Sequence, residues 1–396
     1  MIIKPKFRGF ICTTSHPEGC AHSVQEQISY VKRQKPIKGP KKVLVIGSST
    51  GYGLASRIVS TFGSGASTLG VFLEKPAANT NTATAGWYNT AAFEKAATEA
   101  GYYAKSVNGD AFSDQMKTKV IELIKEDLGQ VDLVIYSIAA PRRTHPVTGE
   151  VFTSVIKPIG DPFTSKTVDM NSNEIVDVTL KPASEEEIRG TVAVMGGEDW
   201  ERWIHCLKDA GVLAPGATTI SYSYIGPTIT YPIYKEGTIG RAKDHLYATS
   251  KEINMQIKDI NGRAFVAVNK ALVTQASAAI PVVPLYLMLL SRVMGKKGLD
   301  ENCIEQMYRL LGSKLYESEN AWSADPMIRV DDYEMRDDVQ EEVARLWEKV
   351  CMGDINIISD LEEYRREFFK LFGFGFDDVD YDKDVKEDVP IPSIPS

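Results

Sequence analysis

The sequence predicts an α/β protein built on a Rossmann-like, doubly wound parallel sheet. Six short runs have the composition of strands, at residues 43–47, 70–75, 102–110, 131–140, 217–223 and 262–268. Helical patterns lie between them, at residues 51–61, 89–100, 113–126, 199–210 and 239–260. Strands that alternate with amphipathic helices predict right-handed crossovers, which wind a parallel sheet with helices on both faces.

We expect one enlarged domain over residues 1–396, in which additions surround the sheet. Its predicted parts are an N-terminal extension (1–40), a dinucleotide-binding half (41–140), an insertion (141–190), a catalytic half (191–296) and a C-terminal extension (297–396). The insertion consists of short Thr- and Val-rich pieces broken by Pro, Gly and Asn, which favours a pair of hairpins or a long loop. Beyond the last predicted strand we expect helices at 283–294, 302–311, 338–349 and 360–371, and then a loosely held acidic tail.

Composition excludes several classes of protein. Lys and Arg number 45 against 53 Asp and Glu, so the net charge of −8 opposes nucleic-acid binding. Five scattered cysteines predict reduced thiols in a cytoplasmic protein, and the N-terminal segment lacks the apolar run of a secretory signal. The uncharged stretch 271–291 is long enough to span a bilayer, but it carries Gln275 and two prolines. We interpret it as a buried segment beside an apolar ligand.

A glycine-rich loop joins the first strand to the first helix and predicts a dinucleotide site. It consists of Gly47, Ser48, Ser49, Thr50, Gly51, Tyr52 and Gly53. Glycines allow the backbone to turn tightly and approach a pyrophosphate, and the start of the helix offers free N–H groups and a positive dipole end. The spacing is G-x-x-x-G-x-G, which is neither the commoner G-x-G-x-x-G nor a Walker loop. A purely structural turn remains the alternative.

Residues at the ends of the next strands complete the predicted cofactor site. Glu74 closes the second run, where a carboxylate accepts hydrogen bonds from ribose hydroxyls and repels a 2′-phosphate, so we expect NADH to be preferred over NADPH. Lys75 beside it softens that discrimination. Further contacts to the cofactor are predicted where strands end, at Leu73, Asp110, Ala111, Ile138 and Ala139.

Two tyrosine–lysine pairs compete as the catalytic pair. Tyr247 and Lys251 have the x3 spacing that places both side chains on one face of a helix, whereas Tyr234 and Lys243 have an x8 spacing. On an unbroken helix, nine positions turn through about 900°, which would place Tyr234 and Lys243 on opposite sides. We therefore expect Tyr234 to lie outside the helix, on a loop folded back over Lys243.

The sequence is similar to the bacterial trans-2-enoyl-CoA and enoyl-acyl-carrier-protein reductases, an enlarged branch of the short-chain dehydrogenase/reductases. The resemblance covers essentially the whole chain. It is carried by the glycine loop, by Tyr234-x8-Lys243 with Ile239-Gly240-Arg241-Ala242-Lys243, by Gly9-Phe10-Ile11-Cys12 and by His16-Pro17-Glu18-Gly19-Cys20. Ordinary members of the superfamily use Tyr-x3-Lys, which the sequence YATSK at 247–251 imitates.

The resemblance implies reduction of an enoyl thioester by NADH, with CoA or a carrier protein as the acyl carrier. Tyr234 would donate to the enolate oxygen, Lys243 would hold the nicotinamide ribose, and Tyr224 would contact the substrate near the same oxygen. Leu272, Val273 and Thr274 would contact the nicotinamide carboxamide. The apolar segment 278–290 would wall the acyl chain, with a core helix as its alternative. Because the additions cover faces that smaller relatives use to assemble, we expect a monomer.

Other chemistries fit the sequence less well. His16, Cys20 and His22, with Cys12 nearby, lack the spacing of a metal site, so we expect no metal, and the resemblance favours a structural lid. Within the enzymes, the alternative is a 3-ketoacyl or 3-hydroxyacyl thioester dehydrogenase that uses Tyr247 and Lys251. From another class, a non-catalytic nucleotide sensor would bind NADH without turnover.

Overall fold

The computed structural model describes most of the chain. The described residues are 1–8, 11–79, 81–169, 174–275, 277, 280, 282–316, 325–353 and 358–395. Gly9 and Phe10 of the N-terminal motif, and Ala278, Ala279 and Pro281 of the predicted acyl-chain wall, lie outside them.

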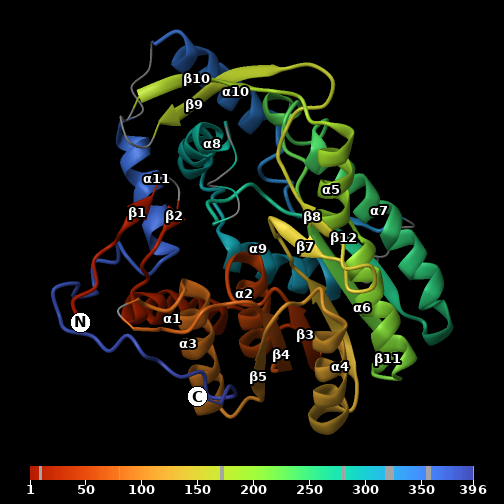
Figure 1. The fold of residues 1–396 in the computed structure, drawn as a ribbon. Helices are drawn as coiled ribbons and strands as arrows, with labels where there is room; N and C mark the ends of the chain where they lie inside the picture. The colour runs from red at the N-terminus through yellow and green to blue at the C-terminus, as the bar shows by residue number, and fades with distance from the viewer. Residues whose placement is uncertain are drawn as a thin grey trace.

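A seven-stranded parallel sheet forms the centre of the molecule, which confirms the predicted fold class (Figure 1). Its strands are β3 (Lys42–Ile46), β4 (Ser67–Phe72), β5 (Ala104–Asn108), β6 (Val131–Tyr136), β11 (Leu213–Ser223), β12 (Arg263–Val268) and β13 (Met327–Arg329). Their order across the sheet is β13-β12-β11-β6-β3-β4-β5, so the direction of winding reverses beside β3. In open α/β sheets, ligands bind at the carboxyl ends of the strands near such a reversal.

Two details of the sheet differ from the sequence prediction. The second strand spans Ser67–Phe72 and not 70–75, because Gly70 lies within it. A Cβ at Gly70 would lie 2.6 Å from the Arg57 guanidinium, so this glycine allows a close approach of helix to strand and does not mark a boundary. The edge strand β13 was not predicted, because three residues carry too little pattern.

Helices cover both faces of the sheet, and successive strand residues alternate between them. Val43 and Val45 pack with α1 (Pro17–Arg33), α2 (Gly51–Ile58), α3 (Ala85–Glu99) and α9 (Cys303–Arg309). Leu44 and Ile46 pack with α4 (Asp114–Leu123), α6 (Glu198–Asp209) and α7 (Thr238–Gln256). Shorter helical turns follow these helices, η1 (Val59–Gly63), η2 (Ile124–Leu128), η4 (Lys258–Ile260) and η6 (Leu310–Tyr316), and η3 (Thr228–Thr230) lies between β11 and α7.

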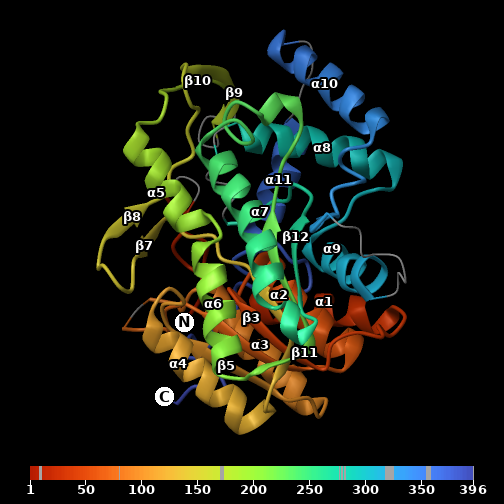
Figure 2. The same cartoon turned by 90° about the vertical axis from the view of Figure 1, so that its right-hand side faces the viewer.

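A second apolar layer lies beyond the carboxyl ends of the strands (Figures 1 and 2). We call it the cap, and it consists of the antiparallel hairpin β9 (Phe163–Asp169) and β10 (Glu174–Leu180) with α8 (Val283–Lys297), α10 (Asp337–Cys351) and α11 (Ile358–Lys370). A second hairpin, β7 (Arg142–Thr144) and β8 (Val151–Thr153), confirms the predicted pair in the insertion. Helix α5 (Glu185–Met195) was not predicted, although the Ser184–Glu187 capping box marks its start.

The acidic tail is not loosely held, so that expectation is wrong. Val385 and Ile391 are buried, and the indole of Trp87 donates to the Val389 carbonyl at 2.8 Å. The Ser393 hydroxyl donates to Glu94 at 2.8 Å. The tail lies against α3 and against the N-terminal segment that carries the short strands β1 (Phe7–Arg8) and β2 (Ile11–Cys12). Apolar residues between the charged ones are buried in this way and hold the tail in place. The net charge of the segment gives no sign of them.

Within the described part of the chain, none of the helices combines the length and apolar character needed to cross a bilayer.

Candidate active site

The glycine loop has the shape of a pyrophosphate cradle. Gly47 has φ +86°, and a Cβ there would lie 2.2 Å from the Ser137 carbonyl oxygen. A Cβ at Gly53 would lie 1.8 Å from the Gly47 carbonyl oxygen. Neither position accommodates a larger residue, because the loop lies directly against β6 and the first turn of α2. Thr50 caps α2 without a side-chain hydrogen bond, so its hydroxyl does not occupy the N–H groups of the first turn.

Glu74 lies beside this loop, as predicted from its place after the second strand. The hydroxyl of Ser49 donates to Glu74 Oε1 at 2.7 Å, and a Cβ at Gly86 would lie 2.0 Å from the same oxygen. Asn108 holds the Glu74 backbone from both sides, by accepting from its N–H and donating to its carbonyl, each at 2.9 Å. The carboxylate is therefore fixed next to the turn that would carry the pyrophosphate.

The other predicted cofactor contacts lie at the same edge of the sheet. Leu73 directly follows β4 and is 71% exposed. The turn after β5 is rigid: the Ala111 carbonyl accepts from Lys117 Nζ at 3.0 Å and from the Trp203 indole at 3.1 Å, and Asp110 accepts from the Phe112 N–H. Ile138 and Ala139 follow β6, with the Ile138 side chain 3.4 Å from the position of a Cβ at Gly47.

The segment 272–274 lies against the glycine loop, although more than 200 residues separate the two in the sequence. The Tyr52 hydroxyl in α2 donates to the Lys270 carbonyl at 2.7 Å. The methyl group of Thr274 lies 4.0 Å from where a Cβ of Gly51 would be. Ser277 donates to the Leu272 carbonyl at 2.6 Å and accepts from the Thr274 N–H at 2.9 Å, which closes the turn, and Val273 packs against the cap.

Tyr234 lies outside helix α7, as its spacing from Lys243 predicts. It occupies the turn before Thr238, and its N–H donates to the Thr230 carbonyl at 2.9 Å. A Cβ at Gly240 would lie 2.7 Å from the Tyr234 carbonyl oxygen, so the glycine lets this turn fold back on the start of α7. The ring of Tyr224 meets that of Tyr234 edge to face, with centroids 4.8 Å apart. Both rings are partly exposed and pack against the cap.

Lys243 lies at the same end of β11 as Tyr224. Its ammonium donates to the carbonyl of Tyr222 at 3.1 Å, two residues before Tyr224. Burial lowers the pKa of Lys243 to about 8 and raises the pKa of Tyr234 above its ordinary value. The site therefore holds a protonated phenol in Tyr234, and an ammonium with a pKa of about 8 lies at the same end of β11.

Tyr247 and Lys251 belong to a different environment. The Tyr247 hydroxyl donates to Asp325 at 3.0 Å, at an exposed position, and the ammonium of the exposed Lys251 lies 4.4 Å from the centroid of the Tyr247 ring. The hydrogen bond and the cation–π contact of this pair therefore involve Asp325 and the pair itself, and neither the glycine loop nor Tyr224 and Tyr234.

One charged group in the site was missed by the sequence analysis. Glu334 is completely buried and accepts from the hydroxyls of Tyr224 at 2.9 Å and Tyr286 at 2.7 Å. The backbone N–H of Ala271 donates to its second oxygen at 2.7 Å. No motif marks this residue, because it follows β13, whose three residues the pattern did not reveal.

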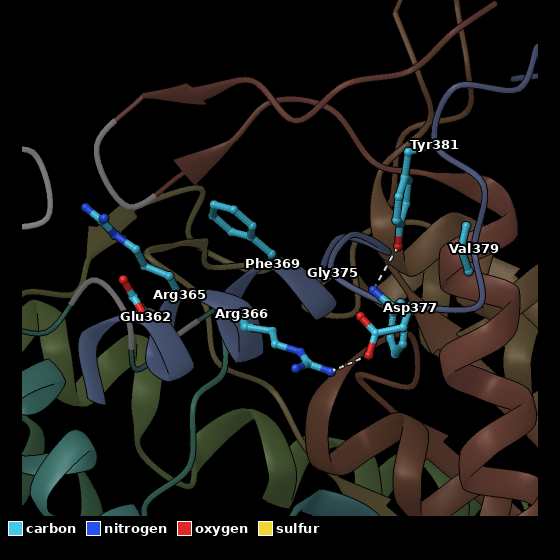
Figure 3. A pocket seen from close by; sticks show the side chains of 9 residues that line it. Glu362, Arg365, Arg366, Phe369, Gly375, Asp377, Val379 and Tyr381 are labelled. Atoms are coloured by element: carbon cyan, nitrogen blue, oxygen red, sulfur yellow. Dashed lines mark hydrogen bonds and ion pairs between the residues drawn. The ribbon is translucent and has the colours of Figure 1, made fainter. Parts of the chain in front are cut away.

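Near the C-terminal end of α11 a separate open pocket of about 550 Å³ is lined by Glu362, Arg365, Arg366, Phe369, Gly375, Phe376, Asp377, Val379 and Tyr381. Figure 3 shows the Arg366 guanidinium turned toward Asp377, with which it forms an ion pair at 3.0 Å. This pocket shares no lining residue with the site described above. Among the described residues, no group of three His, Cys, Asp or Glu side chains is arranged to hold a metal ion.

Three family descriptions match successive parts of the chain. Residues 2–79 match the NAD(P)H binding domain of trans-2-enoyl-CoA reductase, and residues 81–316 match the trans-2-enoyl-CoA reductase catalytic region. Residues 324–385 match a family described as enoyl reductase FAD binding domain.

The described residues of the third region do not fit a flavin dinucleotide. Its only described strand, β13, is followed by Asp331, Asp332 and Glu334 in place of a glycine turn, and these carboxylates already take up the arginines, lysine and other donors around them. In its open pocket the Arg366 guanidinium is already paired with Asp377. The cradle at Gly47–Gly53, by contrast, fits a nicotinamide dinucleotide.

Relatives and solved structures match over the full length of the chain. The chain is 57% identical over 394 residues to a trans-2-enoyl-CoA reductase [NADH] of Ruminiclostridium cellulolyticum, covering 100% of both. It is 57% identical over 396 residues to an enoyl-[acyl-carrier-protein] reductase [NADH] of Cytophaga hutchinsonii, again covering 100% of both.

Two crystal structures show the same fold. One is a trans-2-enoyl-CoA reductase of Clostridium acetobutulicum in complex with NADH, with a TM-score of 0.94, 44% identity and 100% of both chains covered. The other is that of Treponema denticola in complex with NAD, with a TM-score of 0.91, 46% identity, and 97% of this chain and 98% of that chain covered. This chain belongs to the trans-2-enoyl-CoA reductase family.

Proposed function

We propose that Tyr234 is the proton donor at which this chain reduces the trans-2 double bond of an enoyl thioester. The chain is an NADH-dependent oxidoreductase of the trans-2-enoyl-CoA and enoyl-acyl-carrier-protein reductase type. The observation that supports Tyr234 is its place on a turn outside α7, against Tyr224 and at the end of β11 where Lys243 is also held.

The glycine loop and its surroundings would hold the dinucleotide. Backbone N–H groups at the start of α2 would bind the pyrophosphate, Glu74 would bind the adenosine ribose hydroxyls, and the turn at Asp110 and Ala111 would lie against the adenine. Leu272–Thr274 would contact the carboxamide. When bound, NADH supplies the hydride for the β-carbon of the enoyl group.

Tyr234 and Lys243 would stabilise the charge that develops on the thioester oxygen. A 2-enoyl thioester accepts hydride at its β-carbon only if its carbonyl oxygen can carry negative charge as an enolate. The phenol of Tyr234 is protonated at neutral pH, because burial raises its pKa further above 10, so it can donate to that oxygen. The ammonium of Lys243 would bind the nicotinamide ribose and favour the same charge distribution.

The segments outside the sheet support further parts of this proposal. We propose that the acyl chain lies under the cap, against α8, whose described residues between Val283 and Leu290 are all buried. We further propose one enlarged domain over residues 1–396 that acts as a cytoplasmic monomer, since α1 and α9 cover much of one face of the sheet. The mass measured by sedimentation velocity would decide the oligomeric state.

Separate Tyr234→Phe and Tyr247→Phe variants test the assignment. We expect Tyr234→Phe to lower kcat with crotonyl-CoA and NADH by about 10²- to 10⁴-fold, the range for loss of a general acid. Tyr247→Phe should retain wild-type activity and serves as the matched control. Full activity of Tyr234→Phe would overturn the proposal, and wild-type binding of NADH without turnover of any enoyl thioester would identify a nucleotide sensor.

A further inference from the structure

The carboxylate of Glu334 joins three elements that surround the active site. Tyr224 follows β11, Tyr286 belongs to α8 in the cap, and Ala271 directly precedes the segment 272–274. All three donate to Glu334, the two hydroxyls to Oε1 and the Ala271 N–H to Oε2. The carboxylate is therefore placed to fix the relative positions of a tyrosine, the cap and the turn proposed for the carboxamide.

The direction of each hydrogen bond is set by its neighbours. A backbone N–H can only donate, so Ala271 requires an acceptor at Oε2. Tyr286 already accepts from Gln340 Nε2 at 3.2 Å, which leaves its own hydrogen for Glu334. Burial raises the pKa of Glu334, and the donated hydrogen bonds together with nearby Lys270 oppose that shift. An ionised carboxylate is the side chain that accepts from all three donors at once.

This arrangement determines how the hydroxyl of Tyr224 can act. A phenol has one hydrogen, and that of Tyr224 is given to Glu334. The oxygen of Tyr224 can then only accept toward its other neighbours, and its ring lies edge to face against Tyr234. Tyr234 is thereby left as the phenol whose hydrogen is available to the substrate.

We propose that Glu334 is a positioning residue of the reduction, which acts through Tyr224 by holding its hydroxyl as an acceptor beside Tyr234. The proposal rests on the function proposed above. It assigns a role in the active site to the C-terminal region that matches a family described as flavin-binding. It predicts that any kinetic effect of changing Glu334 requires the hydroxyl of Tyr224.

The substitution Glu334→Gln tests this with little change of shape. With its oxygen on the Ala271 N–H, the amide presents an NH₂ group to both tyrosines, so the hydrogen bond to Tyr224 reverses direction while the turn stays held. We expect kcat with crotonyl-CoA to fall about tenfold, because one charge-assisted hydrogen bond is lost. The Kd of NADH should change less than about twofold.

A double-mutant cycle separates positioning from a general structural effect. In a Tyr224→Phe background, Glu334→Gln should cause no further loss of kcat, because the hydroxyl on which it acts is absent. Tyr286→Phe is the matched comparison: it removes the other hydroxyl from the same oxygen but leaves that of Tyr224, so Glu334→Gln should still lower kcat in the Tyr286→Phe background.

Several results would overturn the proposal: wild-type kcat in Glu334→Gln, an equal loss of kcat in the wild-type and Tyr224→Phe backgrounds, or a rise in the Kd of NADH that matches the loss of kcat. Thermal unfolding followed by circular dichroism shows whether each variant is folded. If Glu334→Gln does not fold, Glu334→Asp enters the same cycle, because it keeps the charge but shortens the reach to Tyr224. Full activity of Tyr234→Phe would refute the function of Tyr234 alone, whereas the cycle judges Glu334 independently.

Discussion

The two tyrosine–lysine pairs near α7 contain the same side chains in opposite environments. Tyr234 and Lys243 lie at the end of β11, where burial changes the pKa of both. Tyr247 and Lys251 lie one turn apart on α7, where Tyr247 is half-buried and donates to Asp325 at an exposed hydrogen bond, and Lys251 is exposed. The x3 spacing guarantees that two side chains share a helix face, but it does not say which way that face points. Burial, and not spacing, therefore shifts the pKa values of a tyrosine–lysine pair.

The largest difference between the pairs should appear when each lysine loses its charge. We expect Lys243→Met to lower kcat/KM for crotonyl-CoA by about 100-fold, because it removes a half-buried ammonium from a site where negative charge develops. Lys251→Met should change kcat/KM by less than about twofold, since the ammonium of Lys251 is in water. Steady-state kinetics of both variants checks this, and comparable losses would show that the two pairs do not differ as described.

The second difference concerns pH. The pKa of Lys243 is lowered to about 8, so its ammonium is lost as the pH rises through that value, and kcat/KM should fall about tenfold for each unit above it. The free energy of unfolding should rise with pH between about pH 8 and the ordinary lysine value of 10.5. In that range Lys243 binds a proton in the unfolded chain but not in the folded chain. Activity and urea unfolding measured across that range check both slopes.

Lys243→Arg is the control for this pH dependence. Its guanidinium stays charged throughout the range, so the decline of kcat/KM near pH 8 should disappear even if the overall rate is lower. An unchanged decline in Lys243→Arg would assign the titration to another group.

The smallest expected effect is on stability at the exposed pair. Tyr247→Phe removes the hydrogen bond to Asp325 and should lower the free energy of unfolding by less than about 1 kcal/mol, because water replaces the partner on both sides. The midpoint of urea unfolding measures it. A loss of several kcal/mol would show that this pair is structurally important and not a solvated surface contact.

Much of the molecule could be predicted from patterns in the sequence. The strands at 43–47 and 262–268 were recognised because buried parallel strands are short and rich in β-branched residues. The glycine loop could be recognised because its spacing of glycines is a local pattern. The structure explains the pattern, since a Cβ at Gly47 or Gly53 would collide with neighbouring backbone. Tyr234 was placed outside the helix because helical geometry does not allow an x8 pair to share one face.

Other features left no local pattern. The tail was expected to be loose from its charge, yet Val385 and Ile391 are buried against distant segments of the chain. Glu334 follows a strand of three residues, and acidic residues are common on surfaces, so nothing nearby in the sequence distinguishes it from a solvated carboxylate.

Local patterns in the sequence are enough to identify the type of sheet, the cradle for a dinucleotide and the family to which the chain belongs, because each depends on neighbouring residues and their spacing. Contacts between distant segments decide which tyrosine lies against Tyr224 and which carboxylate accepts from Tyr224. Those outcomes depend on contacts between residues as far apart as Tyr224 and Glu334, and the burial that changes their chemistry exists only when the sheet and the cap pack together.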